Sequence, residues 1–251
     1  MQEIQLERLR YPEIGALLQE GWTTAIFACG ATEQHGPHLP IFVDAEHGTA
    51  LALDIARKLG RTLVAPTIRI GCSDHHLAFP GSLSIRKETF ENLVYDYIHS
   101  LSLHGFTHII VVPTHGGNYQ PLEDMTPRLR SAFPDIHLAV YHQLSGLLDL
   151  WRNQTQAYKG MGDRVGGHAD IAETSFMLHL HPQLVRMDLA EAGFMGHFSE
   201  EVIREMIEKG FKSVTPNGIL GDAHGADPEL GAQLIDALAA QIVHWYRENL
   251  V

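Results

Sequence analysis

The sequence predicts an α/β protein of three layers, α/β/α, in which helices cover both faces of a mostly parallel sheet. Short apolar runs typical of buried strands alternate with longer segments whose apolar residues recur at helical spacing. The chain has 251 residues, of which 45% are hydrophobic, and this is enough to bury a sizeable core. Because no repeat or linker interrupts the pattern, we expect a single domain over residues 1–251.

The expected elements follow one another in βα order. Apolar runs predict strands over residues 23–28, 62–65, 107–112 and 136–141. Helical spacing predicts helices over residues 44–59, 86–103, 121–133, 169–179, 200–209 and 228–249. Two long stretches, residues 142–167 and 211–227, are polar or rich in glycine and are expected to be irregular. The first of them is expected to form a loop over the functional site.

Composition disfavours several kinds of partner. The formal net charge is -12, which argues against nucleic acid and against an anionic membrane surface. No run reaches the roughly 18 apolar residues of a membrane span, and the first residues lack the pattern of a signal peptide. The two cysteines, Cys29 and Cys72, form no CxxC pair. We therefore expect a cytoplasmic protein without a disulfide framework.

Histidine is unusually frequent, with 17 residues against 18 lysines and arginines together. Several histidines lie in short clusters with glycine, aspartate and glutamate, at residues 33–38, 74–76, 115–118 and 167–173. Imidazole and carboxylate together are the ligand set of zinc, manganese and iron sites. Since ligands bind outside the carboxyl ends of strands in open α/β sheets, clusters that follow predicted strands should meet at one site.

The first cluster comes directly after the first predicted strand. Residues two apart in an extended segment point the same way, so Glu33 and His35 can reach one site while Gln34 points away from it. Asp44 stands at the expected start of the next helix and could join them if the intervening loop folds back. An N-cap is an equally good interpretation of Asp44, and one residue could fill both roles.

The third cluster, His115-Gly116-Gly117-Asn118, follows the strongest predicted strand. Its two glycines allow the backbone to approach a metal or substrate, although a tight turn with an exposed histidine is the alternative.

In the fourth cluster, His168 and Glu173 would lie about 140° apart if both were helical. We expect His168 in the glycine turn or the first helical turn, with Glu173 pointing inward from the helix. Asp170 competes with Glu173 as a ligand, because residues three apart share a helix face. The more usual role of an acid at the N-terminus of a helix is to complement the helix dipole.

The loop Gly71-Cys72-Ser73-Asp74-His75-His76 follows the second predicted strand and is expected to form a wall of the substrate pocket. At most one of its adjacent histidines should face the site, because neighbours in an extended segment point apart. Ligation of a metal by one of them is the alternative.

Together the clusters supply enough ligands for a pair of divalent ions bridged by Asp44. These ligands are two imidazoles and three carboxylates: Glu33, His35, Asp44, His115 and Glu173.

These segments resemble the creatininase (creatinine amidohydrolase) family, in the family's order and over most of the chain. The resemblance is carried by residues 30–40 with Asp44, and by residues 75–84, 115–118 and 168–175. It implies an α/β/α fold, assembly as hexamers, and two divalent metals. It further implies Glu33, His35, Asp44 and His115 as ligands, and His168 as an acid/base or substrate-orienting group.

Members of that family hydrolyse cyclic or linear C–N bonds. They include creatininase itself, formamide hydrolases of riboflavin and deazaflavin biosynthesis, and the peptidase that matures the mycofactocin precursor. Creatininase proper carries a glutamate ligand where this chain has Gly117. The HGGN form therefore indicates another branch of the family, in which Glu173 is the natural replacement for that glutamate.

The resemblance implies a metal-dependent hydrolase of an amide, cyclic amide or formamide bond in a small molecule, other than an ordinary peptide bond. A hydroxide bridging two Zn, Mn or Fe ions roughly 3.5 Å apart would attack the carbonyl, and His168 would stabilise the oxyanion or protonate the leaving nitrogen. The expected substrate contacts are Ser73, His75, His76, Gly116 and Asn118.

Three alternatives remain at this stage: hydrolysis of creatinine itself, a peptidase of the mycofactocin-maturation type, and a non-catalytic metal-stabilised oligomer. Phosphoester hydrolysis is a further rival, because pairs of metal ions also serve that chemistry. The negative net charge of the chain and the lack of a lysine or arginine beside the clusters count against phosphoester hydrolysis. The nearest cationic candidates are Arg69, Arg86 and Arg164.

Overall fold

A parallel four-stranded sheet lies at the centre of the computed structural model, which describes residues 2–197 and 199–249. The strands stand in the order β2-β1-β3-β4, and every pair is parallel. Their bounds are Thr24–Cys29 for β1, Thr62–Val64 for β2, His108–Pro113 for β3 and His137–Val140 for β4. All four match strands that the sequence predicts, to within a few residues.

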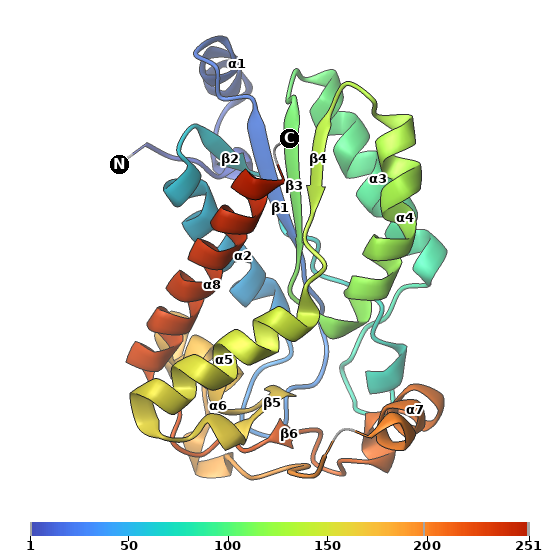
Figure 1. Cartoon of the computed structure of the whole chain (residues 1–251), viewed down its shortest axis with the longest axis vertical. Helices are drawn as coiled ribbons and strands as arrows, with labels where there is room; N and C mark the ends of the chain where they lie inside the picture. Colours follow the sequence, from blue (N-terminus) through green and yellow to red (C-terminus); the bar gives the residue numbers. More distant parts are fainter. Residues whose placement is uncertain (1, 198, 250–251) are drawn as a thin grey trace.

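Helices cover both faces of this sheet, so the predicted three-layer α/β/α architecture is confirmed (Figure 1). On one side lie α2 (Val43–Leu59), α5 (Leu144–Lys159), α6 (Ile171–Leu180) and α8 (Pro228–Glu248). On the other side lie α3 (Lys87–Leu103) and α4 (Tyr119–Ala132), together with part of α1 (Tyr11–Gln19). The shorter α7 (Glu200–Lys209) packs beyond the carboxyl ends of the strands.

Alternate residues of each strand face opposite layers. In β3, Ile110 and Val112 pack with the layer of α2 and α8, while Ile109 and Val111 pack with α3 and α4. All four side chains are buried. A strand that is covered on both faces reads as a continuous apolar run, which is why β3 is the clearest strand in the sequence.

A two-stranded antiparallel ribbon, β5 (Val165–His168) and β6 (Leu220–Gly221), lies beyond the carboxyl ends of the central strands (Figure 1). It brings residues after α5 next to residues after α7. The chain then turns sharply from β5 into α6 at Ala169, which adopts a left-handed φ of 54°. This turn places both His168 and the first turn of α6 near the end of the sheet.

The expectation of an irregular loop over residues 142–167 is wrong, because this segment forms α5 and β5. Helix α5 buries Leu147, Trp151 and Thr155, which stand four residues apart on one face, and it ends at Gly160 in the left-handed conformation. Residues 211–227 are largely irregular, as expected, apart from β6 and a short 3-10 turn.

Cys29 and Cys72 are free thiols, as the sequence predicts. Among the described residues, no helix combines the length and apolarity that crossing a membrane requires.

Close packing of α8 on α6 gives a prediction about stability. A Cβ at Gly231 of α8 would lie 2.1 Å from the Ser175 carbonyl oxygen of α6, whereas a Cβ at Gly15 of α1 would meet nothing within 4 Å. We expect G231A to destabilise the protein, because overpacking costs about 1–3 kcal/mol, more than the roughly 1 kcal/mol that alanine gains in a helix. We expect G15A to be neutral or stabilising. Urea unfolding of both variants measures the difference, and equal stabilisation by the two would contradict this packing.

Candidate metal centre

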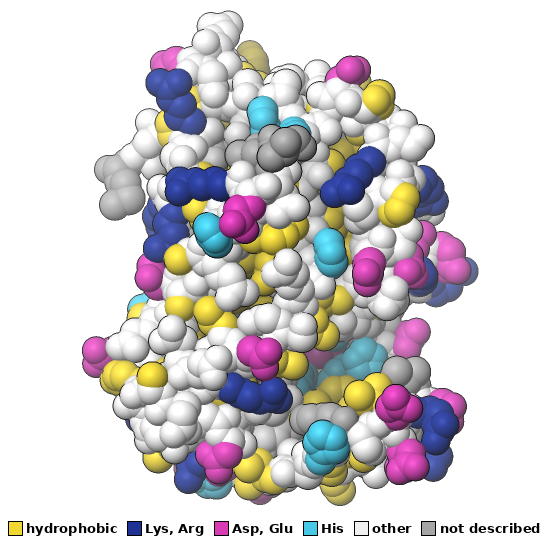
Figure 2. Space-filling view, in the orientation of Figure 1, with side chains coloured by type: hydrophobic (Ala, Val, Ile, Leu, Met, Phe, Trp, Pro, Cys, Tyr) yellow, Lys and Arg dark blue, Asp and Glu magenta, His cyan; other side chains and the backbone are white. Residues whose placement is uncertain are grey.

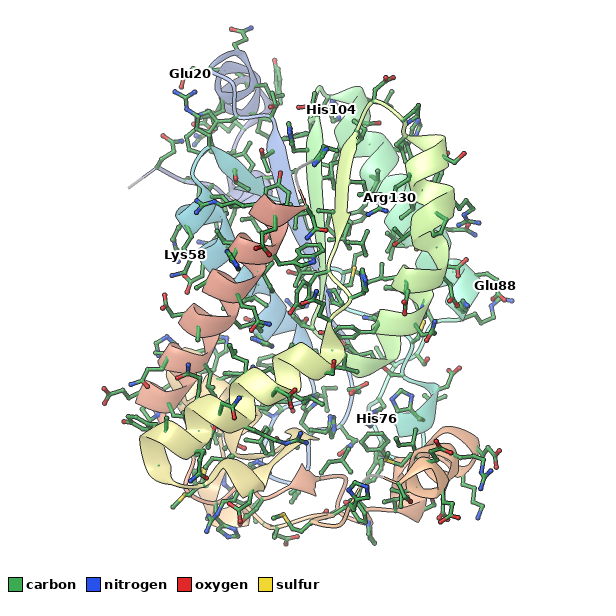
Figure 3. All side chains as sticks on the ribbon, in the orientation of Figure 1. Glu20, Lys58, His76, Glu88, His104 and Arg130 are labelled. Atoms are coloured by element: carbon green, nitrogen blue, oxygen red, sulfur yellow. The ribbon has the colours of Figure 1, made fainter. Side chains whose placement is uncertain are left out.

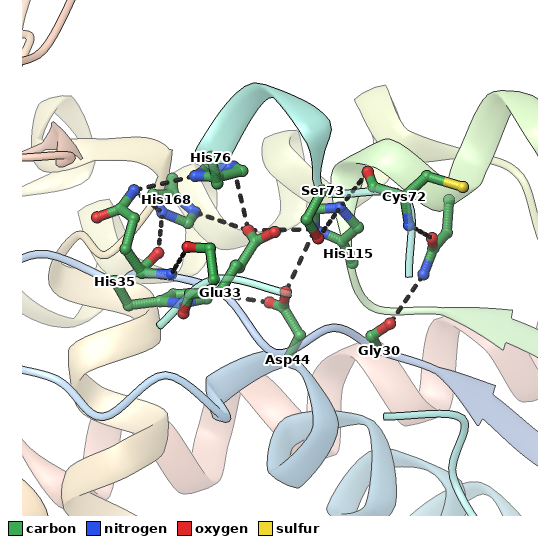
Figure 4. A network of polar contacts seen from close by, with 12 residues as sticks. Gly30, Glu33, His35, Asp44, Cys72, Ser73, His76, His115 and His168 are labelled. Carbon is green, nitrogen blue, oxygen red and sulfur yellow. Dashed lines mark hydrogen bonds and ion pairs between the residues drawn. The ribbon is translucent and has the colours of Figure 1, made fainter. Parts of the chain in front are cut away.

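Five acidic and imidazole side chains form a buried cluster at the carboxyl ends of β1 and β3. They are no more than 4% exposed, and they are the predicted ligands Glu33, His35, Asp44, His115 and Glu173. Figure 4 shows Glu33, His35, Asp44 and His115 of this cluster. The first two come from the segment after β1, and His115 comes from the segment after β3. Asp44 lies in the first turn of α2, whose N-cap is Phe42. The N-cap interpretation of Asp44 is therefore wrong, and its side chain faces the cluster instead.

The two carboxylate oxygens of Asp44 face two different histidines. Asp44 Oδ2 lies 3.3 Å from His115 Nδ1, which in turn lies 3.2 Å from Glu33 Oε1. Asp44 Oδ1 lies 3.3 Å from His35 Nε2, which lies 3.6 Å from Glu173 Oε2. Each of the two histidines thus lies between two carboxylates, and Asp44 contacts both histidines. The donor atoms of Glu33, His35 and Asp44 also lie within 4.8 Å of one another.

These spacings fit metal ligands. Donor atoms at about 2.0–2.2 Å from a tetrahedral ion lie roughly 3.3 Å from one another. Within the described part of the chain, Glu33 Oε2 and Asp44 Oδ2 are buried without a hydrogen-bond partner. Buried polar atoms are normally satisfied, and a cation would satisfy both of these. The donor set could therefore hold two divalent ions with Asp44 between them.

Hydrogen bonds to main-chain carbonyls orient both ligand histidines. His115 Nε2 donates to the Cys72 oxygen at 3.0 Å, and His35 Nδ1 donates to the Glu33 oxygen at 3.1 Å. In each ring the opposite nitrogen faces the carboxylates. Such bonds fix the ring and leave the inner nitrogen available to bind a cation.

The carboxylates also shift the pKa values of their neighbours. Burial opposes protonation of His35, but the charges of Asp44 and Glu173 raise its pKa to about 10. Burial likewise opposes protonation of His115, whose pKa nevertheless rises well above its usual range beside Glu33 and Asp44. Burial raises the pKa of Glu173 to about 8, with His35 opposing the shift and Asp44 adding to it. Protons are therefore the counter-charges of the cluster when no metal is bound.

The structure explains why glycine stands at position 117. A Cβ there would lie 2.1 Å from the Cys72 oxygen and 2.6 Å from His115 Nε2, so a glutamate cannot be accommodated in this backbone arrangement. Glu173 approaches His35 from α6 instead, and its Oε2 accepts a hydrogen bond from the Ala169 main-chain nitrogen at 2.5 Å.

Asp170 is the N-cap of α6 and is not part of the cluster. One of its oxygens accepts from the main-chain nitrogens of Gly166 and Gly167, and the other accepts from those of Ala172 and Glu173. Both oxygens are thus committed to the turn between β5 and α6. Of the two competing acids, Glu173 is the one that faces the histidines.

His168 is the last residue of β5, so the expectation that it lies in the glycine turn or the first helical turn is wrong. Its Nε2 donates to the main-chain oxygen of Gln34 at 2.8 Å, and its Nδ1 lies 3.8 Å from Glu33 Oε1. Burial, reinforced by the charge of His35, lowers the pKa of His168 well below the usual range. The structure therefore presents a neutral imidazole with a free Nδ1 at the edge of the cluster.

His75 and His76 both contact the cluster, so the expectation that at most one of them faces it is wrong. They lie in a 3-10 turn, where neighbouring side chains do not point in opposite directions. His76 Nε2 lies 3.2 Å from Glu33 Oε1, and the His75 ring stacks on His115 at 5.7 Å. Figure 3 shows His76 above α7, and Figure 2 shows a hollow at this place with histidine side chains in it.

Two of the expected substrate contacts are engaged within the protein. Ser73 Oγ lies 3.3 Å from His115 Nε2, on the side of the ring that faces away from the carboxylates. The Asn118 amide nitrogen donates to the main-chain oxygens of Cys29 and Gly30, and its oxygen accepts from the Cys72 nitrogen. Asn118 is fully buried and ties the ends of β1 and β3 to the loop after β2, which leaves no N–H for a substrate.

Gln34 is the residue of the site that the sequence analysis missed. The expectation that it points away is wrong, because its amide nitrogen lies 3.0 Å from His76 Nδ1 and 2.9 Å from His168 Nε2. Because side chains alternate in direction along an extended segment, the sequence predicts only that Gln34 points to the side opposite Glu33 and His35. It gives no indication that two further histidines lie on that other side.

A small cavity of about 50 Å³ opens beside the cluster. One wall is apolar and comes from α5, through Leu144, Leu147, Leu148 and Trp151, and Gly116 also lines the cavity. The described residues that line it include no lysine or arginine. Arg69 is paired with Glu46 at 2.8 Å and Arg164 with Asp222 at 3.4 Å, so neither is directed to the site.

An α/β/α protein with a buried imidazole–carboxylate cluster beyond its strand ends has the scaffold and donor set of a metal-dependent hydrolase. The chain belongs to the Creatininase family, whose sequence model, described as creatinine amidohydrolase, matches residues 7–246.

Similar proteins of known name extend over most of the chain. It is 29% identical to the mycofactocin precursor peptide peptidase of Mycobacterium ulcerans, with 94% of each chain covered. It is 27% identical to the creatinine amidohydrolase of Pseudomonas putida, with 72% of this chain and 73% of that protein covered.

Among solved structures, a creatinine amidohydrolase (creatininase) has the same fold. It superposes with a TM-score of 0.85 at 22% identity, over 100% of this chain and 99% of the other. A zinc–zinc form of a mutant creatininase has a TM-score of 0.81 at 24% identity, over 100% and 99% of the two chains. A manganese form has a TM-score of 0.77 at 24% identity, over 99% of each.

The raised pKa values of His35 and His115 predict that metal binding releases protons. Both histidines are protonated near neutral pH when no metal is bound, and a metal binds only the unprotonated nitrogen. We expect the affinity for Mn²⁺ or Zn²⁺ to increase with pH, about tenfold per pH unit for each proton displaced. Calorimetric titration in two buffers of different ionisation enthalpy counts the protons. Affinity independent of pH, or proton uptake, would contradict this charge distribution.

Proposed function

We propose that the protein is a metal-dependent hydrolase of a C–N bond in an amide, cyclic amide or formamide. It acts as one domain over residues 1–251, with two divalent ions (Zn, Mn or Fe) per chain. Their proposed ligands are Glu33, His35, Asp44, His115 and Glu173. The observation that carries this proposal is the Asp44 carboxylate, whose two oxygens face His35 and His115 separately.

Bound divalent ions would supply an activated water molecule and polarise a substrate carbonyl. The chain's own residues then account for the proton transfer. His168 Nδ1 carries no proton and faces the cluster, so it can accept a proton from the attacking water and pass it to the leaving nitrogen. The apolar wall of α5 would exclude bulk water from the reacting bond.

The lining of the cavity favours a neutral reacting group over a phosphoester. Enzymes of phosphoryl transfer place lysine, arginine or metal ions against the transferred group. Here the described lining residues offer two acids and two imidazoles next to leucine and tryptophan side chains, without a lysine or arginine. An amide, cyclic amide or formamide is compatible with such a wall.

A peptide is the second candidate substrate. The relative from Mycobacterium ulcerans is named for a precursor peptide and covers 94% of the chain, a larger share than the creatinine amidohydrolase of Pseudomonas putida covers. The restriction to bonds other than ordinary peptide bonds is therefore not supported by this relative. Gly117 also separates the chain from creatininase proper, since the backbone leaves no room for a glutamate ligand there.

The remaining elements of the proposal rest on the family resemblance, for the assembly, and on composition and charge, for the location and partners. We propose a homo-oligomer, with a hexamer as the expected form, in the cytoplasm, with neither nucleic acid nor membrane as a partner. A metal-stabilised oligomer without activity is the competing non-enzymatic function. Structural zinc sites are typically rich in cysteine, whereas this cluster is rich in carboxylates.

Substitutions in the cluster should separate metal binding from turnover. We expect E33Q and H35A to lose metal and activity together, because each removes a ligand. We expect H168A to retain two metals and lose roughly 10²–10⁴ in rate, the typical contribution of a general acid–base group. Elemental analysis of each purified variant measures the first effect, and kinetics measure the second.

Matched controls are available at the far end of the molecule, where Figure 3 shows Glu20 and His104. E20Q and H104A should leave both metal content and rate unchanged. An H168A protein with unaltered kinetics would remove His168 from the mechanism.

A substrate screen tests the proposed function itself. The metal-loaded protein is assayed against creatinine, formamidopyrimidines, simple cyclic amides and short peptides, with a phosphomonoester as the comparison. Hydrolysis of one C–N substrate that E33Q does not catalyse would support the proposal. Tight metal binding without turnover of any amide or peptide would favour the structural oligomer.

A further inference from the structure

Two main-chain groups orient the side-chain amide of Gln34. Gln34 Oε1 accepts a hydrogen bond from the Gly36 main-chain nitrogen at 2.9 Å. Gln34 Nε2 donates to the Gly218 main-chain oxygen at 3.1 Å. A flipped amide would set its NH₂ against the Gly36 N–H and its oxygen against the Gly218 carbonyl. The position of each atom therefore follows from partners whose donor or acceptor character is fixed.

This orientation determines which nitrogen of His76 carries the proton. Gln34 Nε2 is a donor and lies 3.0 Å from His76 Nδ1, so Nδ1 must accept. The proton of the neutral ring is then on Nε2, which lies 3.2 Å from Glu33 Oε1. His76 therefore donates a hydrogen bond to the Glu33 carboxylate.

The main chain of the same residue determines the tautomer of His168. A carbonyl oxygen can only accept, so His168 Nε2, at 2.8 Å from the Gln34 oxygen, carries the proton. The two N–H bonds of the Gln34 amide are used by His76 and Gly218. The 2.9 Å approach of Gln34 Nε2 to His168 Nε2 then brings two donors together without a hydrogen bond between them, a contact that the bonds to His76, Gly218 and the Gln34 oxygen must outweigh.

We propose that Gln34 is a positioning residue that fixes the tautomers of His76 and His168. Its side chain makes His76 a hydrogen-bond donor to Glu33, and its carbonyl turns the unprotonated Nδ1 of His168 toward the cluster. The inference deepens the function proposed above and rests on its metal site. The metal ligands alone do not determine which nitrogens of His76 and His168 carry protons. In this proposal Gln34 determines both.

One consequence is that His76 is expected to hydrogen-bond to Glu33 rather than to bind a third metal ion. Donor atoms of Glu33, His76 and His168 lie within 4.8 Å of one another, which by distance alone resembles a ligand set. With its proton on Nε2 directed at the Glu33 carboxylate, His76 would have to lose that proton before Nε2 could bind a metal. His76 Nε2 and His115 Nδ1 both approach Glu33 Oε1, while Oε2 has no hydrogen-bond partner among the described residues and could face a cation.

Gly218 completes the arrangement from a distant part of the sequence. Its φ is +81°, and a Cβ there would lie 1.9 Å from Gln34 Oε1. A side chain at position 218 would therefore displace the amide. The carbonyl that holds Gln34 Nε2 comes from the same residue.

The test is to measure the histidine tautomers by long-range ¹H–¹⁵N spectra of the metal-free protein, which require neither turnover nor metal. In the wild type we expect the proton on Nε2 of both His76 and His168. The variant Q34E replaces the donor by an acceptor of the same shape. It should place a proton on His76 Nδ1, which accepts in the wild type, while His168 keeps its proton on Nε2 because a main-chain carbonyl sets its tautomer. The control is Q241A in α8, which removes the hydrogen bond from the Gln241 amide to the Tyr141 hydroxyl and should change neither ring.

A metal titration supplies the second measurement. We expect two Mn²⁺ ions per wild-type chain and an affinity about 10–100-fold lower in Q34E, the usual effect of losing a group that orients a ligand.

A wild-type His76 protonated on Nδ1, or a third bound ion that H76A removes, would overturn the inference, and neither result depends on the folding of Q34E. A wild type that binds no metal would instead refute the proposed function, while the spectra would still test the tautomers.

Discussion

Negative charge buried at one edge of the sheet is the constraint on which the rest of the structure depends. Glu33, Asp44 and Glu173 are each at most 4% exposed and stand around the same two imidazoles. Removing a carboxylate from water costs several kcal/mol unless a counter-charge and hydrogen bonds compensate. His35 and His115 provide that compensation, and main-chain carbonyls hold both rings with one nitrogen facing the acids. The fold therefore maintains a place for positive charge, whether protons or metal ions provide it.

The central sheet and most of its helices could be predicted because their signals are local. A strand buried on both faces is a continuous apolar run, as in β3, and long helices such as α3 and α8 show their periodicity over many residues. The grouping of Glu33, His35, Asp44 and His115 followed from topology, because parallel strands end at one edge of the sheet.

What the sequence could not reveal depends on contacts between distant segments. Helix α5 has one buried face, but most of its sequence is polar. Strand β5 contains two adjacent glycines, which are not typical of a strand. The sequence could not decide whether Asp170 or Glu173 belongs to the cluster. The structure decides it, because four main-chain N–H groups donate to the Asp170 carboxylate. His76 and Gln34 join the site because a 3-10 turn and an extended segment are pressed together by tertiary packing.

The hydrogen bond from Gln34 to Gly218 joins residues 184 positions apart. Contacts of such long range are slow to form, because the entropy of closing a large loop must be spent first. During synthesis, Glu33, His35 and Asp44 leave the ribosome long before the segment that fixes their neighbouring amide exists. A nascent chain can thus present some of the carboxylates and imidazoles without the ordered site. Full assembly of the site therefore also requires the segment that contains Gly218, which lies far along the chain from Glu33, His35 and Asp44.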